Sequence, residues 1–119
     1  MLEIIPFQDT RVIAMKLDGG ISTAEIEQTW ELIEELRKIH EKLRVYVEYH
    51  NFSGIDFQGL LINIPKKFEH FTDFEREAVV SDQQWLSTSI KVGDRFFPSI
   101  EVKHFGFEEI QQAQQWIQE

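Results

Sequence analysis

The chain has 119 residues, of which 42% are hydrophobic and 28% charged, a composition typical of one soluble globular domain spanning residues 1–119. Its net charge of −9 opposes binding to nucleic acid and to anionic membranes, since both attract patches of Lys and Arg. Cysteine is absent, which excludes disulfides and thiol nucleophiles and fits a cytoplasmic protein, and no apolar run approaches the roughly 20 residues of an integral membrane segment.

The first residues are predicted to form a hairpin. Residues 2–7 and 11–18 have the pattern of two strands, and the connection over residues 8–10 is short enough to favour antiparallel pairing. One face of the second strand is clearly apolar, with Ile13, Met15 and Leu17. Gly19 and Gly20 end this strand.

A helix is then expected from Ser22 to about His40. Ser22 and Glu25 have the spacing of a capping box, in which each side chain bonds the backbone amide of the other residue. The apolar side chains recur at helical spacing and form one wide stripe, composed of Ile26, Trp30, Leu32, Ile33, Leu36 and Ile39.

The middle of the chain alternates strands with helices. Residues 43–49 have the two-residue period of a strand with Leu43, Val45, Val47 and Tyr49 on one side, and an amphipathic helix is expected from about Phe57. Pro65 interrupts that helix, because proline lacks an amide donor and clashes with the preceding turn, so either a kink near Pro65 or two short helices with Pro65 opening the second is expected.

The remaining elements complete an α/β domain. Strands are expected at residues 74–80 and 100–105, and helices from Gln83 and from Phe107. The order is therefore β-β-α-β-α-β-α-β-α. Helices between the later strands imply parallel crossovers, so the sequence predicts a mixed, mostly parallel sheet of about five strands.

Polar residues follow the predicted strands at their carboxyl ends, where open α/β sheets place binding sites. The strand-end polar cluster comprises His50, Ser53, Asp56 and Asp82. A hydrolytic set could be drawn from Ser53, His50 and Asp82, but the glycine-flanked turn of a nucleophilic serine is missing. Helix caps explain the same residue types, and the sequence contains no local metal or phosphate motif. No catalytic, metal or cofactor residue is therefore assigned.

Two runs and the element order resemble the SpoIIAA-like family, small bacterial proteins related to the STAS domains of anti-sigma-factor antagonists. The runs are residues 47–56 (VEYHNFSGID) and residues 74–85 (FEREAVVSDQQW). The resemblance covers nearly the whole chain. It implies a STAS-like fold and a non-enzymatic regulatory or protein-interaction role.

The resemblance also bears on regulation by phosphorylation. In STAS antagonists the second helix opens with Asp-Ser-Ser-Gly or a close variant, and one serine is phosphorylated by a partner kinase. The matching stretch here is Asp56-Phe57-Gln58-Gly59, in which neither middle residue carries a hydroxyl group. The phosphorylation switch is therefore not carried over, and its role is not transferred to Ser53.

A second implication is a small hydrophobic ligand, because the family is grouped by fold with CRAL-TRIO-type domains. A pocket could be lined by residues that would otherwise form core, namely Phe57, Leu61, Ile64, Phe68, Trp85, Phe96 and Phe97. We also expect a homodimer, since a sheet edge and exposed aromatic residues in so small a domain need to be covered.

Overall fold

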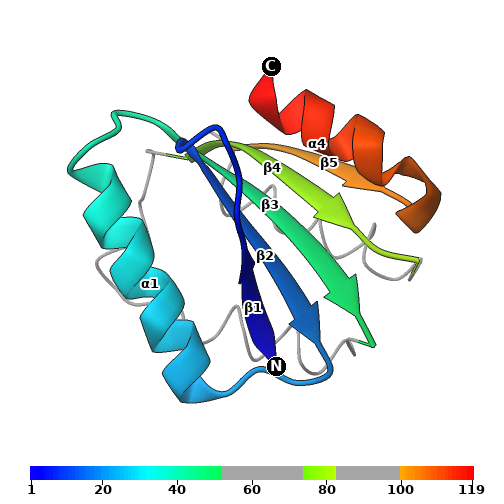
Figure 1. Cartoon of the computed structure of the whole chain (residues 1–119), viewed down its shortest axis with the longest axis horizontal. Coiled ribbons are helices and arrows are strands. Elements are labelled where there is room, and N and C mark those ends of the chain that lie inside the picture. Colours follow the sequence, from blue (N-terminus) through cyan, green and yellow to red (C-terminus); the bar gives the residue numbers. More distant parts are fainter. Residues whose placement is uncertain (52–73, 83–99) are drawn as a thin grey trace.

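The computed structural model describes residues 1–51, 74–82 and 100–119, and within them lies a five-stranded sheet with the strand order β1-β2-β3-β4-β5 (Figure 1). The strands are β1 (Leu2–Ile5), β2 (Val12–Asp18), β3 (Leu43–His50), β4 (Phe74–Val80) and β5 (Glu101–Phe105). The five predicted strands are confirmed. Only β1 is clearly shorter than expected, since it ends at Ile5 rather than at residue 7.

The sheet is mixed and mostly parallel, as predicted. Strand β1 pairs with β2 in antiparallel fashion, whereas β2, β3, β4 and β5 pair in parallel. Asp18 on β2 is in register with His50 on β3, and both residues end their strands. The carboxyl ends of β2 to β5 consequently lie at one edge of the sheet.

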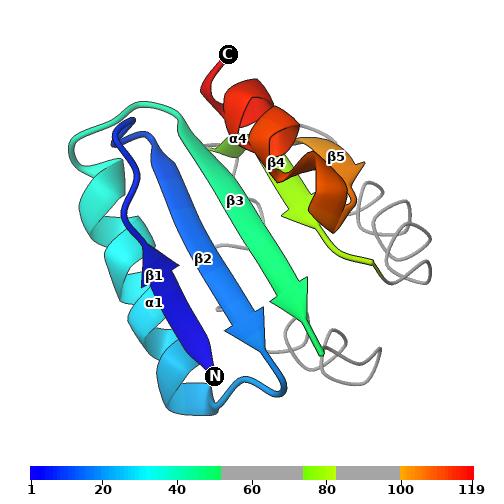
Figure 2. The same cartoon turned by 45° about the vertical axis from the view of Figure 1, so that its right-hand side comes forward.

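Helices cover both faces of this sheet. Helix α1 (Thr23–Arg37) lies behind the sheet in Figure 2, and helix α4 (Ile110–Gln118) lies in front of it, across β3 and β4. The core on the α1 face contains Ile13, Met15, Leu17, Ile33, Leu43, Val47, Tyr49, Phe74 and Val79. The core on the α4 face contains Val12, Ala14, Tyr46, Ala78, Val80, Phe105, Ala113 and Ile117.

The start of α1 is fixed by the predicted capping box. Ser22 Oγ accepts from the Glu25 amide at 3.1 Å, and the Glu25 carboxylate accepts from the Ser22 amide at 3.1 Å. The second Glu25 oxygen accepts from the Leu2 amide, which joins the helix to β1. The hydrogen bonds from these backbone amides, first that of Ser22 and then that of Leu2, lower the pKa of Glu25. The helix ends at Arg37, three residues before His40, whose Nε2 lies 3.1 Å from Thr10 Oγ1.

The end of α4 is fixed by three arginines from distant parts of the chain. The Arg44 guanidinium donates to the Ile117 carbonyl at 2.9 Å, Arg76 donates to Trp116 at 3.0 Å, and Arg11 donates to Gln118 at 3.4 Å. The last carbonyls of a helix lack intrahelical donors and carry partial negative charge, so cationic donors stabilise them. These three hydrogen bonds hold the carboxyl end of α4 in place against the rest of the protein.

A short 3-10 helix, η2 (Phe107–Glu109), precedes α4 where the sequence predicts one continuous helix from Phe107. No helix within residues 1–51, 74–82 and 100–119 has the length and apolarity required to cross a membrane. The helices expected from about residue 57 and from residue 83, with the kink near Pro65, lie outside these ranges.

Candidate functional site

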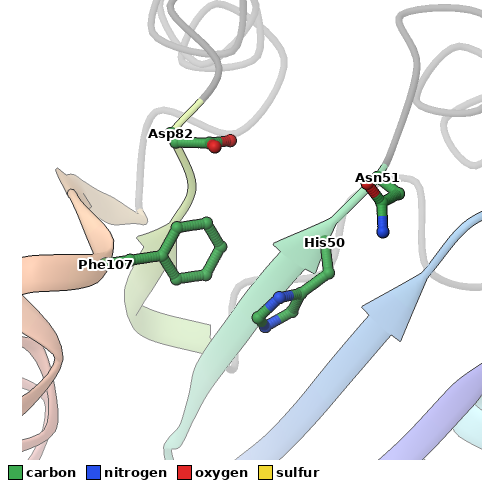
Figure 3. Close-up of a pocket in the computed structure, with 4 residues that line it drawn as sticks. All are labelled: His50, Asn51, Asp82 and Phe107. Carbon is green, nitrogen blue, oxygen red and sulfur yellow. The ribbon is translucent and has the colours of Figure 1, made fainter.

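A pocket of about 350 Å³ lies at the edge of the sheet where the parallel strands end. Its described lining, hereafter the strand-end pocket, consists of His50, Asn51, Asp82 and Phe107 (Figure 3). His50 is the last residue of β3 and Asn51 follows it, Asp82 comes two residues after β4, and Phe107 opens η2 after β5. Three strands therefore contribute to one site.

The backbone at the end of β3 is fixed by local contacts. Asn51 has a φ of +51°, a left-handed conformation that asparagine adopts more readily than most residues. Its side-chain amide donates to Asp18 Oδ1 at 3.2 Å. The amide of Gly19, whose φ is +70°, donates to the His50 carbonyl at 3.0 Å. The turn after β2 thus holds the first wall of the pocket.

A hydrogen-bonded chain runs along the α4 face of β3 to the pocket. The Tyr46 hydroxyl donates to Glu48 Oε2 at 2.6 Å, and Glu48 Oε1 lies 3.1 Å from His50 Nε2. These residues share a face because side chains in a strand alternate with a period of two. An ionised carboxylate only accepts, so His50 donates through Nε2, and in the neutral ring Nδ1 is the acceptor.

This series of hydrogen bonds begins at Tyr46 in the core and ends at His50 in the pocket. Burial raises the pKa of Tyr46, and its bond to the Glu48 carboxylate raises it further, so this hydroxyl remains a donor. The side chain of Glu48 is 13% exposed and that of His50 is 28% exposed. Phe107 packs against His50: the two ring centroids lie 4.6 Å apart, and the angle between the ring planes is 38°.

The structure brings together two members of the predicted strand-end polar cluster, His50 and Asp82. Ser53 and Asp56 lie outside the described residues, so the conceivable Ser-His-Asp set is described only in part. All the residues expected to line an apolar pocket also lie outside them, namely Phe57, Leu61, Ile64, Phe68, Trp85, Phe96 and Phe97.

Sequence reasoning missed Glu48, Asn51 and Phe107 as parts of the site. Glu48 could have been identified from its position two residues before His50 on the same strand face. Asn51 carried the signal of a polar residue that tolerates positive φ at a strand end. Nothing local marked Phe107, because the contact between its ring and His50 joins residues from β3 and η2.

His104 on β5 is not part of the described lining of this pocket. Its register partner on β4 is Val79, which belongs to the core on the α1 face. Within the described part of the chain, His104 Nε2 is buried and has no hydrogen-bond partner. Also within that part, no three His, Asp or Glu side chains are grouped closely enough to hold a metal ion.

Comparisons with known proteins agree on the kind of protein but name no activity. A family model described as SpoIIAA-like matches residues 12–118. The chain is similar to a crystal structure of an uncharacterized protein of the DUF3478 family, with a SpoIIAA-like fold, from Shewanella loihica PV-4. The TM-score is 0.65 at 21% identity over 98% of this chain and 92% of that one, which shows a shared fold. No curated protein matches the chain significantly.

Proposed function

Because the chain belongs to the SpoIIAA-like family, we propose that it is a non-enzymatic regulatory domain that binds a partner protein at the strand-end pocket. The observation that carries this proposal is the convergence of His50, Asn51, Asp82 and Phe107 from three strand ends. In the sequence, Asn51 of the lining immediately precedes the stretch that corresponds by resemblance to the corner carrying the phosphorylated serine in STAS antagonists. Partner binding at this edge would therefore persist here without that serine.

The side chains of the pocket are held in place by bonds within the protein. His50 is bonded to Glu48 and packs against Phe107, and Asn51 is bonded to Asp18. Side chains that are already ordered lose little conformational entropy when a ligand binds, which favours affinity. A carboxylate–histidine pair also occurs in hydrolases, but the described lining of this pocket carries no hydroxyl or thiol nucleophile.

Affinity purification from the native cell tests this proposal with two matched charge reversals. Asp82→Lys places a new cation at the pocket, whereas Glu31→Lys alters an exposed position on α1, on the other face of the sheet. We expect the same partner to be captured by the wild type and by Glu31→Lys, and to be lost with Asp82→Lys. Equal capture by all three proteins, or no specific partner for any of them, would contradict the proposal.

Self-association is a second proposal, and exposed apolar side chains at one edge of the sheet support it. Within the described part of the chain, strand β1 has a neighbour only on the β2 side, and its residue Ile4 is 45% exposed. Apart from the Leu2 amide, which donates to Glu25, an edge strand of this kind offers backbone donors and acceptors to a second copy. Two β1 strands meeting about a twofold axis would make one continuous sheet of a homodimer.

The alternative role as a carrier of a small hydrophobic ligand depends on residues outside the described part of the chain. Native mass spectrometry of protein purified from its source tests it directly. A co-purified apolar molecule is the expected result for a carrier. Ligand-free protein whose melting temperature no fatty acid raises would argue against this role, since a bound ligand stabilises the folded state.

A further inference from the structure

We propose that the strand-end pocket recognises a primary ammonium group, which Asp82 and Phe107 contact directly. This inference rests on the proposed function in that the same pocket is the binding site, and it adds the chemistry of the group that is bound. Three independent features point to it, namely the charge around the pocket, the acceptors in its lining and its aromatic wall.

The described residues around the pocket carry negative charge. Among the described residues the lining contains an exposed carboxylate, Asp82, and neither lysine nor arginine. Further carboxylates bond to the lining or follow it in the chain, namely Asp18, Glu48, Glu108 and Glu109. Lys16 is in register with Glu48, and it is not part of the described lining. The Glu48 carboxylate also lies 3.1 Å from His50 Nε2, so the described charges around the pocket favour cations.

The polar groups of the lining are acceptors. The Asn51 amide nitrogen is already engaged by Asp18, which leaves its carbonyl oxygen as the acceptor. His50 Nε2 is engaged by Glu48, which leaves Nδ1 as the acceptor of the neutral ring. Together with the Asp82 carboxylate, these described groups match the three donors of a primary ammonium, and none of these three side-chain groups would donate to an anionic ligand.

Phe107 supplies the aromatic wall. Figure 3 shows the Phe107 ring and the Asp82 side chain extending from the same side toward His50 and Asn51. Ammonium groups are attracted to the face of an aromatic ring within about 6 Å of its centroid. A cation beside Asp82 can therefore contact Phe107 at the same time.

The pocket volume limits the size of the ligand. Its value of about 350 Å³ lies near the lower end of the range for small-molecule sites, roughly 300–1,000 Å³. This volume suits an alkyl chain that ends in an ammonium group. Such a group occurs on a free amine and on a lysine side chain of a partner protein, and the two sources share the same recognition chemistry.

Titration of the full chain with propylammonium chloride, followed by amide NMR signals, tests the inference. Sodium propionate is the control probe, because it has similar size and the opposite charge. We expect saturable shifts at Asn51, Asp82 and Phe107 with propylammonium and none with propionate. Asp82→Asn should weaken binding about five- to tenfold, and Phe107→Leu about threefold, whereas Glu31→Gln should leave the affinity unchanged.

Two further probes separate the sources of the ammonium group. Tighter binding of spermidine than of Nα-acetyl-lysine amide, which keeps its side-chain ammonium, would assign the site to a free amine. The reverse order would assign it to a lysine side chain.

Three results would overturn the inference: equal binding of propionate and propylammonium, unchanged affinity in Asp82→Asn, or no saturable shift with any amine. The proposed function would survive such a result if a partner still bound the wild type but not Asp82→Lys. Thermal unfolding of each variant confirms that the comparison is made between folded proteins.

Discussion

Replacing Arg44 with methionine should loosen α4 from the sheet. Arg44 is 6% exposed, and its guanidinium donates to the Ile117 carbonyl at 2.9 Å and to Glu75 Oε1 at 2.7 Å. Methionine retains much of the aliphatic volume but none of the donors. The substitution therefore leaves a helix-terminal carbonyl without this partner and removes the cation beside Glu75.

The magnitude follows from the exposure of the two groups left behind. A hydrogen bond to a charged group contributes about 1.5–3 kcal/mol, and removing one member of a fully buried ion pair costs about 3–5 kcal/mol. The Glu75 side chain is 36% exposed, so water can solvate it after the substitution. The loss of stability should therefore lie toward the lower end of these two ranges. We expect Arg44→Met to reduce the free energy of unfolding by about 2–3 kcal/mol.

Urea unfolding followed by circular dichroism measures this loss, and Arg76→Met is the matched control. The Arg76 side chain is 25% exposed and lies 3.6 Å from Glu101, so its replacement should cost only about 1 kcal/mol. Glu75→Gln should destabilise the wild type more than it destabilises Arg44→Met, since the two residues are coupled. A smaller loss for Arg44→Met than for Arg76→Met would refute the reasoning.

Two other predictions concern the tyrosines and the edge of the sheet. The chain has two tyrosines, Tyr46 and Tyr49, and burial raises the pKa of both above the ordinary value of 10.0. The unfolded chain ionises at that value while the folded chain does not, so this contribution to stability is complete below pH 10 and is lost as the pH rises above it. Tyrosinate absorbance should consequently appear only as the circular dichroism of the fold disappears, and tyrosinate forming near pH 10 in folded protein would contradict this. For the homodimer, Ile4→Lys should reduce the mass measured by light scattering from two chains to one, whereas Ile39→Lys, at a position 73% exposed beyond α1, should not. A monomeric wild type, or a dimeric Ile4→Lys, would exclude the β1 interface.

Local patterns predicted most of the described fold because they act over a few residues. The capping of α1 by Ser22 and Glu25 follows from spacing alone, and the two-residue alternation in β3 follows from the geometry of a strand. The position of α4 was harder to predict. An apolar stripe shows that Ala113 and Ile117 are buried, but it does not show which face of the sheet they cover.

The site was predictable to the extent that topology determines it. Parallel strands bring their carboxyl ends to one edge, so His50 and Asp82 could be expected to lie near each other. The bond between Glu48 and His50 depends on side-chain rotamers, and the packing of Phe107 on His50 depends on where η2 docks. Such contacts between distant residues leave no periodic signal in the chain.

The three arginines that bind the carboxyl end of α4 have a consequence for the order in which the protein can fold during synthesis. When the ribosome has released residues 1–80, the strands that carry Tyr46, Ala78 and Val80 are present, but residues 110–118, which cover that face, are not. The nascent chain then exposes an apolar surface, and Arg44 has its partner Glu75 but not yet its acceptor on Ile117. Partly folded chains of this kind aggregate or bind chaperones. Helix α4 therefore closes the second face of the sheet only after residues 110–118 have been translated.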